Sequence, residues 1–148
     1  MKIEVSQKIN TSRDKLWTAI TDFENCTNWI SAIQSVEVLE RPDAGLLGFK
    51  WRETRTMFGK EATETMWITN VDDGRSYTTR AESHGAIYTS GLSIEGDDGD
   101  LTLKMSFSGE PQTFSAKIMS AVMSPFFKGA TEKAVKQDLI DIKQHIES

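Results

Sequence analysis

Two glutamates and one arginine offer the most specific chemistry in the sequence. Glu53 and Arg55 alternate along one predicted strand, and Glu64 lies on the next strand. A tight turn at Phe58 and Gly59 would place Glu53 opposite Glu64, because strand residues pair by counting outward from the turn. Two facing carboxylates repel each other, so one takes up a proton unless Arg55 compensates the charge. Such a cluster can orient the polar group of a ligand or act as general acid and base.

The same cluster has a plainer interpretation. The two glutamates lie near a predicted turn, where charged side chains at the open end of a sheet form solvated ion pairs. Ligand recognition, catalysis and a simple ion-pair cluster all remain open at this point. Further polar residues share the predicted inward face and could join any of these arrangements: Asn70, Tyr77, Ser83 and Tyr88.

The other reactive residue types favour structural roles. His84 precedes a glycine in a predicted turn, and His145 lies near a helix end, where a positive charge is favourable. Cys26 has no histidine near it in sequence to activate it as a nucleophile. The acidic run Asp97–Asp100 lacks the spacing of a calcium loop, and Asp72–Asp73 is a similar turn. We expect no metal and no cofactor, because phosphate-binding and nucleophile-elbow motifs are also missing.

The N-terminal part of the chain predicts a strand, two short helices and a second strand. Apolar and charged residues alternate over Lys2–Ile9, which indicates a strand. Thr11 or Ser12 can cap a helix that continues with apolar residues at helical spacing. A short second helix or turn is predicted over Asn25–Ala32, and a strand over Gln34–Glu40.

The segment from Gly48 to Gly109 predicts a meander of antiparallel strands. Turn signals recur at short intervals and end with a longer acidic loop over Gly96–Asp100. Counting outward from the turns gives one consistent inward face, and a slip of one residue would exchange the two faces. The apolar side chains on the inward face are Phe49, Trp51, Met66, Ile68, Tyr77, Tyr88, Leu92, Ile94, Leu101, Leu103, Met105 and Phe107.

The count also predicts individual partners. Ala81 should face Tyr88, Asn70 should face Tyr77, and Ile94 should face Leu101. The acidic loop would then place Tyr88 opposite Phe107 and Ser90 opposite Met105. The other face of the sheet is predicted to be rich in threonine and exposed to solvent, with Trp67 and Ile87 as its apolar exceptions.

A helical pattern from about Gln112 to Ile146 would cover the apolar face of the sheet. Pro125 should kink this helix or mark a break. Its first half is apolar nearly all round, so some of these side chains should line a portal, meet a partner or act as a lid. They include Met119, Val122, Met123, Phe126 and Phe127.

Composition limits the class of protein. The 148 residues suit one domain over residues 1–148, and 17 Lys and Arg against 22 Asp and Glu leave a net charge of −5. We therefore expect no nucleic-acid partner, because phosphate binding needs a basic face. No run approaches the roughly 20 apolar residues of a membrane span, and the start lacks the apolar region of a signal peptide. These features predict a soluble cytoplasmic protein without integral membrane association.

The order of elements resembles the helix-grip fold. The opening residues Ile9–Ser12, Leu16–Trp17, Ile20–Phe23 and Trp29 resemble the START-like (SRPBCC) superfamily, and more narrowly its polyketide cyclase/dehydrase branch. The closing helix Asp138–Glu147 is similar to the end of that branch. The resemblance covers the whole chain. It implies an α+β fold in which a curved antiparallel sheet of about seven strands wraps around a long C-terminal helix.

The resemblance also implies a cavity between sheet and helix for a small hydrophobic molecule, such as a lipid or a polyketide-like compound. No catalytic motif is common to the family, so Glu53, Glu64 and Arg55 are the candidates for polar or catalytic roles. A cyclase or dehydratase enzyme and an adaptor that binds partners through the apolar helix are the alternatives. A homodimer through Trp67 or Phe126–Phe127 is also open. The predicted ligand-binding residues are Phe49, Trp51, Met66, Ile68, Tyr77, Tyr88, Met105, Phe107, Met119, Val122, Met123 and Phe126.

Overall fold

The computed structural model describes the backbone of residues 2–57, 59–83 and 85–148, and their side chains except those of residues 57, 116 and 118–127. Its elements follow the predicted order closely. They are β1 (Lys2–Ile9), α1 (Arg13–Ile20), the 3₁₀ helix η1 (Cys26–Asn28), β2 (Ile33–Glu40), β3 (Lys50–Met57), β4 (Lys60–Asp72), β5 (Ser76–Ser83), β6 (Ala86–Asp97), β7 (Asp100–Pro111) and α2 (Phe114–Glu147).

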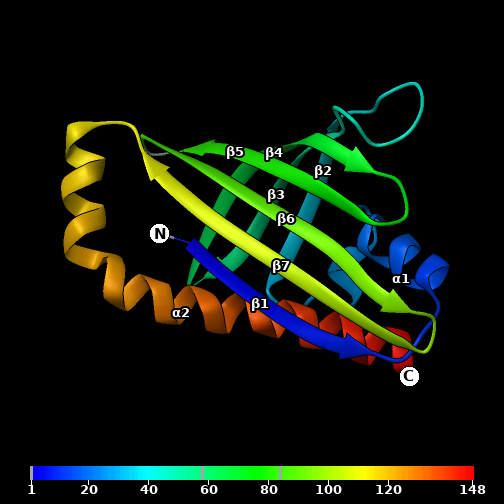
Figure 1. Ribbon diagram of the computed structural model, residues 1–148. Coiled ribbons are helices and arrows are strands. Elements are labelled where there is room, and N and C mark those ends of the chain that lie inside the picture. The colour runs from blue at the N-terminus through cyan, green and yellow to red at the C-terminus, as the bar shows by residue number, and fades with distance from the viewer. Residues whose placement is uncertain (1, 58, 84) are drawn as a thin grey trace.

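The described strands form one antiparallel sheet with the order β1-β7-β6-β5-β4-β3-β2. Strands β2 to β7 are a meander, and β1 completes the sheet by pairing with β7. The sheet curves around the long helix α2, while α1 and η1 lie at one end of it (Figure 1). This is the α+β helix-grip architecture that the sequence predicts. The connections from β3 to β7 are short hairpins, so the order of these strands along the chain sets their order in the sheet.

Helix α2 is continuous across Pro125 and bent. Figure 1 shows the bend where the ribbon passes from yellow to orange. Proline has no N–H for the helical hydrogen bond and its ring crowds the preceding turn, which accounts for a kink. The kink is therefore confirmed, and the helix does not break. Beyond the bend, α2 runs along β1 and β7 and contacts α1.

A β-bulge changes one predicted partner. Ile68 pairs with Thr79 as predicted, but the register shifts between Ile68 and Asn70. Val71 therefore faces Tyr77, and the prediction that Asn70 faces Tyr77 is wrong. Asn70 is exposed instead of sharing the inward face, because one extra residue in a strand turns the following side chains over.

The last hairpin is tighter than predicted. Asp97 pairs with Asp100, so only two residues form the turn, and Ile94 faces Leu103 instead of Leu101. Tyr88 consequently lies opposite Gly109, not Phe107. The predicted partner of Ser90 is wrong in the same way, because Ser90 faces Phe107. The shift is two residues, an even number, so every side chain keeps its predicted face.

Arg13 attaches α1 to the hairpin turns at the same end of the sheet. Its guanidinium donates to the carbonyl oxygens of Gly74 (3.3 Å), Ile94 (3.1 Å) and Gly96 (2.8 Å). The carboxylate of Asp98 accepts the backbone N–H of Arg13 at 2.9 Å. One side chain thus links the start of a helix to two separate turns.

We expect Arg13→Ala to lower the free energy of unfolding by about 2 kcal/mol, because it removes several hydrogen bonds from a charged donor. Urea unfolding measured by circular dichroism provides the test. Lys15→Ala is the matched control on the same helix, since the Lys15 side chain is exposed. Equal losses in the two variants would show that the Arg13 contacts do not hold α1 in place.

Candidate functional site

The concave face of the sheet is sealed at one end and accessible at the other. Near α1, Leu103 on β7 is 0% exposed and Ile94 on β6 is 4% exposed. Further along the same two strands, Phe107 and Tyr88 are only half-buried. Helix α2 and α1 therefore cover the first end more completely than the second. Half-buried aromatic residues on a concave surface are typical of a site for apolar ligands.

The predicted ligand-binding residues divide between these two ends. Phe49, Trp51, Ile68 and Tyr77 belong to the buried core, where aromatic side chains pack tightly around Phe23. The half-buried members lie nearer the accessible end. They are Met66, Tyr88, Met105 and Phe107. The predicted ligand contacts from α2, namely Met119, Val122, Met123 and Phe126, lie outside the described side chains.

A buried ion-pair cluster lies between β3 and α2. Arg55 donates from Nε to Glu53 Oε2 and from Nη2 to Asp138 Oδ2, both at 3.0 Å. Trp51 Nε1 donates to Glu53 Oε1 at 3.4 Å. The side chains of Arg55, Glu53 and Asp138 are 20%, 11% and 7% exposed. Arg55 thus compensates Glu53, and the second carboxylate that it holds is Asp138, which sequence reasoning did not select.

Asp138 carries the clearest electrostatic perturbation of the cluster. Burial raises the pKa of its carboxyl above the ordinary value, and the Arg55 guanidinium offsets only part of that effect. Its second oxygen, Oδ1, is buried without a hydrogen-bond partner among the described residues. The sequence did hold a signal, because Asp138 interrupts the apolar stripe of Val135, Leu139 and Ile142 on the helix.

Glu64 lies opposite Glu53 in the β3–β4 ladder, as predicted. It is half-buried, and no described residue forms a hydrogen bond or ion pair with it. Tyr88 stacks on Phe107 with ring centroids 5.7 Å apart. Burial raises the pKa of the Tyr88 hydroxyl, and the negative charge of Glu64 adds to this effect.

Cys26 is a structural thiol. It is buried, and its Sγ donates to the carbonyl oxygen of Phe23 at 3.3 Å. Burial raises its pKa to about 12, and the charge of Glu53 acts in the same direction. A thiol with this pKa holds its proton near neutral pH and is a poor nucleophile. The structure therefore favours a structural role for Cys26 over a role as nucleophile.

The remaining candidates have mainly structural contacts. The ring of His145 stacks on Trp29 at 4.1 Å, and His84 lies outside the described residues. In the acidic turn, Asp100 pairs with exposed Lys8 at 3.1 Å. Among the described residues no group of acidic, histidine and cysteine side chains has a metal-binding arrangement. None of the described helices has the length and apolar composition needed to cross a membrane.

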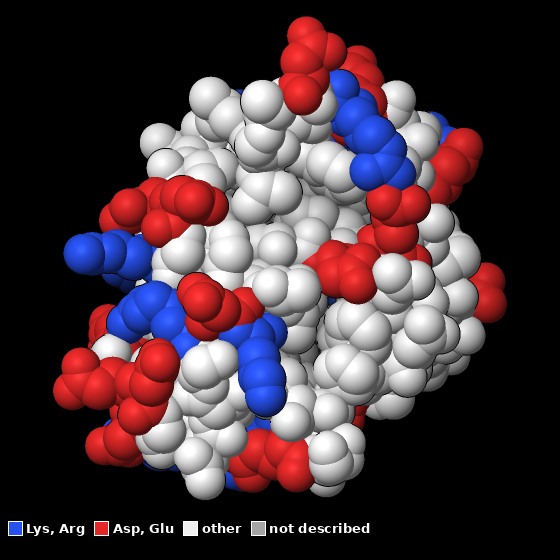
Figure 2. Space-filling model, turned by 90° about the vertical axis from the view of Figure 1, so that its right-hand side faces the viewer, with Lys and Arg blue, Asp and Glu red and all other residues white. Residues whose placement is uncertain are grey.

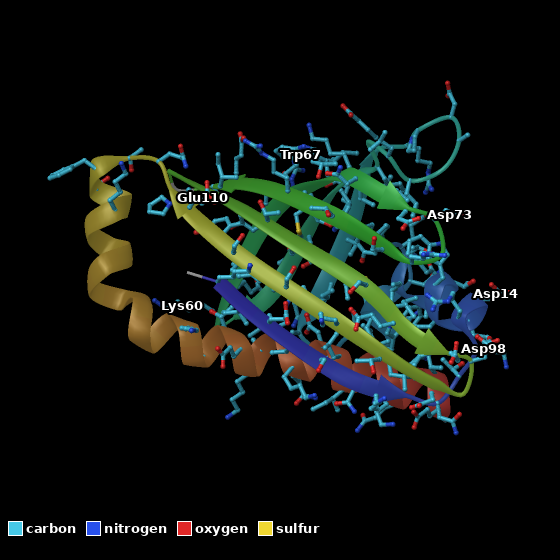
Figure 3. The ribbon with its side chains drawn as sticks, viewed as in Figure 1. Asp14, Lys60, Trp67, Asp73, Asp98 and Glu110 are labelled. Carbon is cyan, nitrogen blue, oxygen red and sulfur yellow. The ribbon has the colours of Figure 1, made fainter. Side chains whose placement is uncertain are left out.

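Charged side chains of both signs share the end of the molecule near α1. Figure 2 shows acidic and basic side chains interspersed there, without a continuous basic patch on the face in view. Trp67 lies on the outer side of the sheet, away from α2 (Figure 3). The Lys50 ammonium is 5.9 Å from its ring centroid.

Removing the Arg55 cation should destabilise the fold strongly, because Glu53 and Asp138 would remain buried without compensation. We expect Arg55→Met to lower the free energy of unfolding by about 3 kcal/mol at pH 7. Burial already raises the pKa of the Asp138 carboxyl, and loss of the Arg55 charge raises it further, so protonation of Asp138 at lower pH favours folding of the variant. The loss should therefore shrink as the pH falls from 7 to 4 in urea titrations.

Arg52→Met is the matched control for this prediction. Arg52 lies on the same strand but on the outer face, where it pairs with exposed Glu37 at 3.1 Å. Such surface pairs contribute about 0.5 kcal/mol. A pH-independent loss in Arg55→Met, or a loss no greater than that in Arg52→Met, would contradict the assignment of Arg55 as the charge-compensating group.

Comparison with solved structures identifies the fold. A protein of Thermus thermophilus, TTHA0849, superposes with a TM-score of 0.82 at 12% identity over 99% of this chain and 97% of that one. A START superfamily protein from Mycobacterium smegmatis superposes with a TM-score of 0.82 at 13% identity, over the same shares of the two chains. The Zhui aromatase/cyclase from Streptomyces sp. R1128 superposes with a TM-score of 0.75 at 15% identity, over 99% of this chain and 93% of that one. At these identities the likeness shows the shared fold alone.

A comparison with curated protein sequences gives no match. The family comparison is more specific, because it matches nearly the whole chain, residues 1–147. Its match agrees with the sheet, the long helix and the START-type neighbours described above. The chain belongs to the family described as polyketide cyclase / dehydrase and lipid transport.

Proposed function

We propose that the protein binds a small hydrophobic molecule, such as a lipid or a polyketide-like compound, between the concave face of the sheet and α2. The observation that carries this proposal is the change from buried to half-buried apolar side chains along β6 and β7. The family to which the chain belongs includes lipid-transport proteins, which supports the same function.

The accessible apolar side chains can contribute substantially to binding. The apolar wall combines methionines with aromatic rings, which adapt their packing to ligands of different shape. Each Å² of apolar surface that a ligand removes from water contributes roughly 25 cal/mol. In the proposed complex the ligand body rests on Met66, Tyr88, Met105 and Phe107.

Arg55 is suited to hold an oxygen of the ligand. Its guanidinium has five N–H groups, of which two serve the hydrogen bonds to Glu53 and Asp138. The side chain is still 20% exposed, and three of its N–H groups take no part in these two ion pairs. Because the two ion pairs fix the guanidinium, little conformational entropy is lost when a ligand carbonyl or hydroxyl binds.

A cyclase or dehydratase activity is the second candidate. It is favoured by Asp138, whose raised pKa keeps a proton available closer to neutral pH than an ordinary carboxyl does. Glu64 is the matching base candidate, since it has no ion pair among the described residues. The fold neighbour from Streptomyces named above is an aromatase/cyclase, which supports testing this chemistry.

We expect Tyr88→Ala and Phe107→Ala each to weaken binding of the neutral fluorescent probe N-phenyl-1-naphthylamine by about tenfold, as expected for loss of an aromatic contact. Fluorescence titration measures the affinity. Trp67→Ala is the control, because it removes an aromatic ring from the outer face. If the native protein fails to bind the probe, and native mass spectrometry finds no copurified molecule, the binding proposal is wrong.

For the enzymatic candidate, Glu64→Gln should abolish turnover of a poly-β-ketone substrate while leaving its binding within about threefold of native. Product analysis by mass spectrometry gives the rate, and equilibrium titration gives the affinity. Unchanged turnover in Glu64→Gln would remove Glu64 as the base. Parallel losses of turnover and affinity would support a role in binding only.

A further inference from the structure

We infer that the ligand of this site carries a positively charged group, such as an ammonium, which binds between Glu64 and the Tyr88–Phe107 pair. The inference rests on the proposed binding function and names the class of its ligand. Glu64 is half-buried on the concave face, and no described residue pairs with it.

Among the described side chains, the charges at the polar end of the site are not balanced. One cation, Arg55, faces the carboxylates of Glu53 and Asp138, and both of its ion pairs are formed within this group. Glu64 adds a third carboxylate directly opposite Glu53. Even with a proton on Asp138, carboxylates outnumber the cation. An anionic ligand would increase the repulsion, whereas a cationic ligand would reduce it.

Among the described side chains on the inward row of β4, Lys60 is the one cation. It is exposed and lies at the end of the strand, four residues from Glu64. At roughly 3.3 Å per residue the two Cα atoms are about 13 Å apart. This separation agrees with the finding that no ion pair forms between them. Lys60 therefore leaves the Glu64 carboxylate available to a ligand.

The aromatic pair provides a second attraction for a cation. Tyr88 and Phe107 are stacked with an interplanar angle of 20°, and both are half-buried, so part of the ring surface is accessible. The face of an aromatic ring is negatively polarised and attracts ammonium groups. Gly109 permits this arrangement, because a Cβ at that position would lie 3.1 Å from the Tyr88 ring.

Glu64 and Tyr88 act on the same small region of the sheet. Tyr88 faces Ala81 on β5, and Ala81 in turn faces Met66, the inward neighbour of Glu64 on β4. The small Ala81 side chain occupies little of the space between them. The charge of Glu64 reaches the Tyr88 hydroxyl strongly enough to raise its pKa further. A carboxylate beside an accessible aromatic pair suits an alkylammonium better than a carboxylate ligand.

The test compares decylammonium, decanol and decanoate, which share one alkyl chain and differ in charge. Each displaces N-phenyl-1-naphthylamine from the native protein at pH 7.5, at fixed ionic strength and below its micelle concentration. We expect decylammonium to bind about tenfold more tightly than decanol, and decanoate to bind most weakly. A decanoate affinity equal to or above that of decylammonium overturns the inference.

Variants then locate the selectivity. Glu64→Gln should bring the affinity for decylammonium close to that for decanol. Tyr88→Leu keeps apolar volume but removes the ring, so decylammonium should lose more affinity than decanol. Glu61→Gln is the control, because Glu61 is exposed and opposite Thr56, outside the inward row.

Two results separate this inference from the proposed function. If all three compounds bind with equal affinity, the protein binds hydrophobic molecules but does not select a cation, and only the inference fails. If neither the probe nor any of the three compounds binds, the proposed function fails as well. A loss of affinity for all three compounds in Glu64→Gln would assign Glu64 to the structure of the site and overturn its role in charge selection.

Discussion

The ion pair between Arg55 and Asp138 determines how the sheet and the C-terminal helix fit together. It joins β3 to α2 across 83 positions of sequence, inside an interface made otherwise largely of apolar side chains. Desolvation makes such a pair a weak source of net stability, but separating the two charges inside the protein would be costly. The rotation of α2 is thereby restricted to the one that places Asp138 against Arg55. The same rotation directs Leu139 and Ile142 into the core.

How well the sequence predicts the sheet depends on whether an error in strand register is an even or an odd number of residues. The hairpin between β3 and β4 follows from its two-residue turn, so the pairing of Glu53 with Glu64 was predictable. Across the β6–β7 hairpin the pairing differs from the predicted pairing by two residues, which changes the partner of Tyr88 but not its face. The bulge before Asn70 shifts the strand by a single residue and reversed that side chain. A bulge has no strong signature in one sequence, because it depends on how neighbouring strands twist.

The candidate site was less predictable than the sheet, because it combines a strand with a helix. Counting along hairpins brings Glu53, Glu64 and Arg55 together, but no such count relates β3 to α2. The one sign of Asp138 in the sequence is its position as a charged residue within an apolar stripe. The sequence also does not distinguish the sealed end of the inward face from its accessible end. Leu103 and Phe107 both follow the apolar alternation of β7, yet they differ in burial. That difference arises from the path of α2, which bends instead of following the sheet along its whole length.

In the proposed complex, the ion pairs that hold the sheet against the helix and the residues that select the charge of the ligand are different. Arg55 is engaged by Glu53 and Asp138, so its charge is used largely within the protein. Glu64, one strand away, forms no ion pair with any described residue. Substitutions at Glu64, Tyr88 or Phe107 can therefore change ligand preference without breaking the contact between sheet and helix.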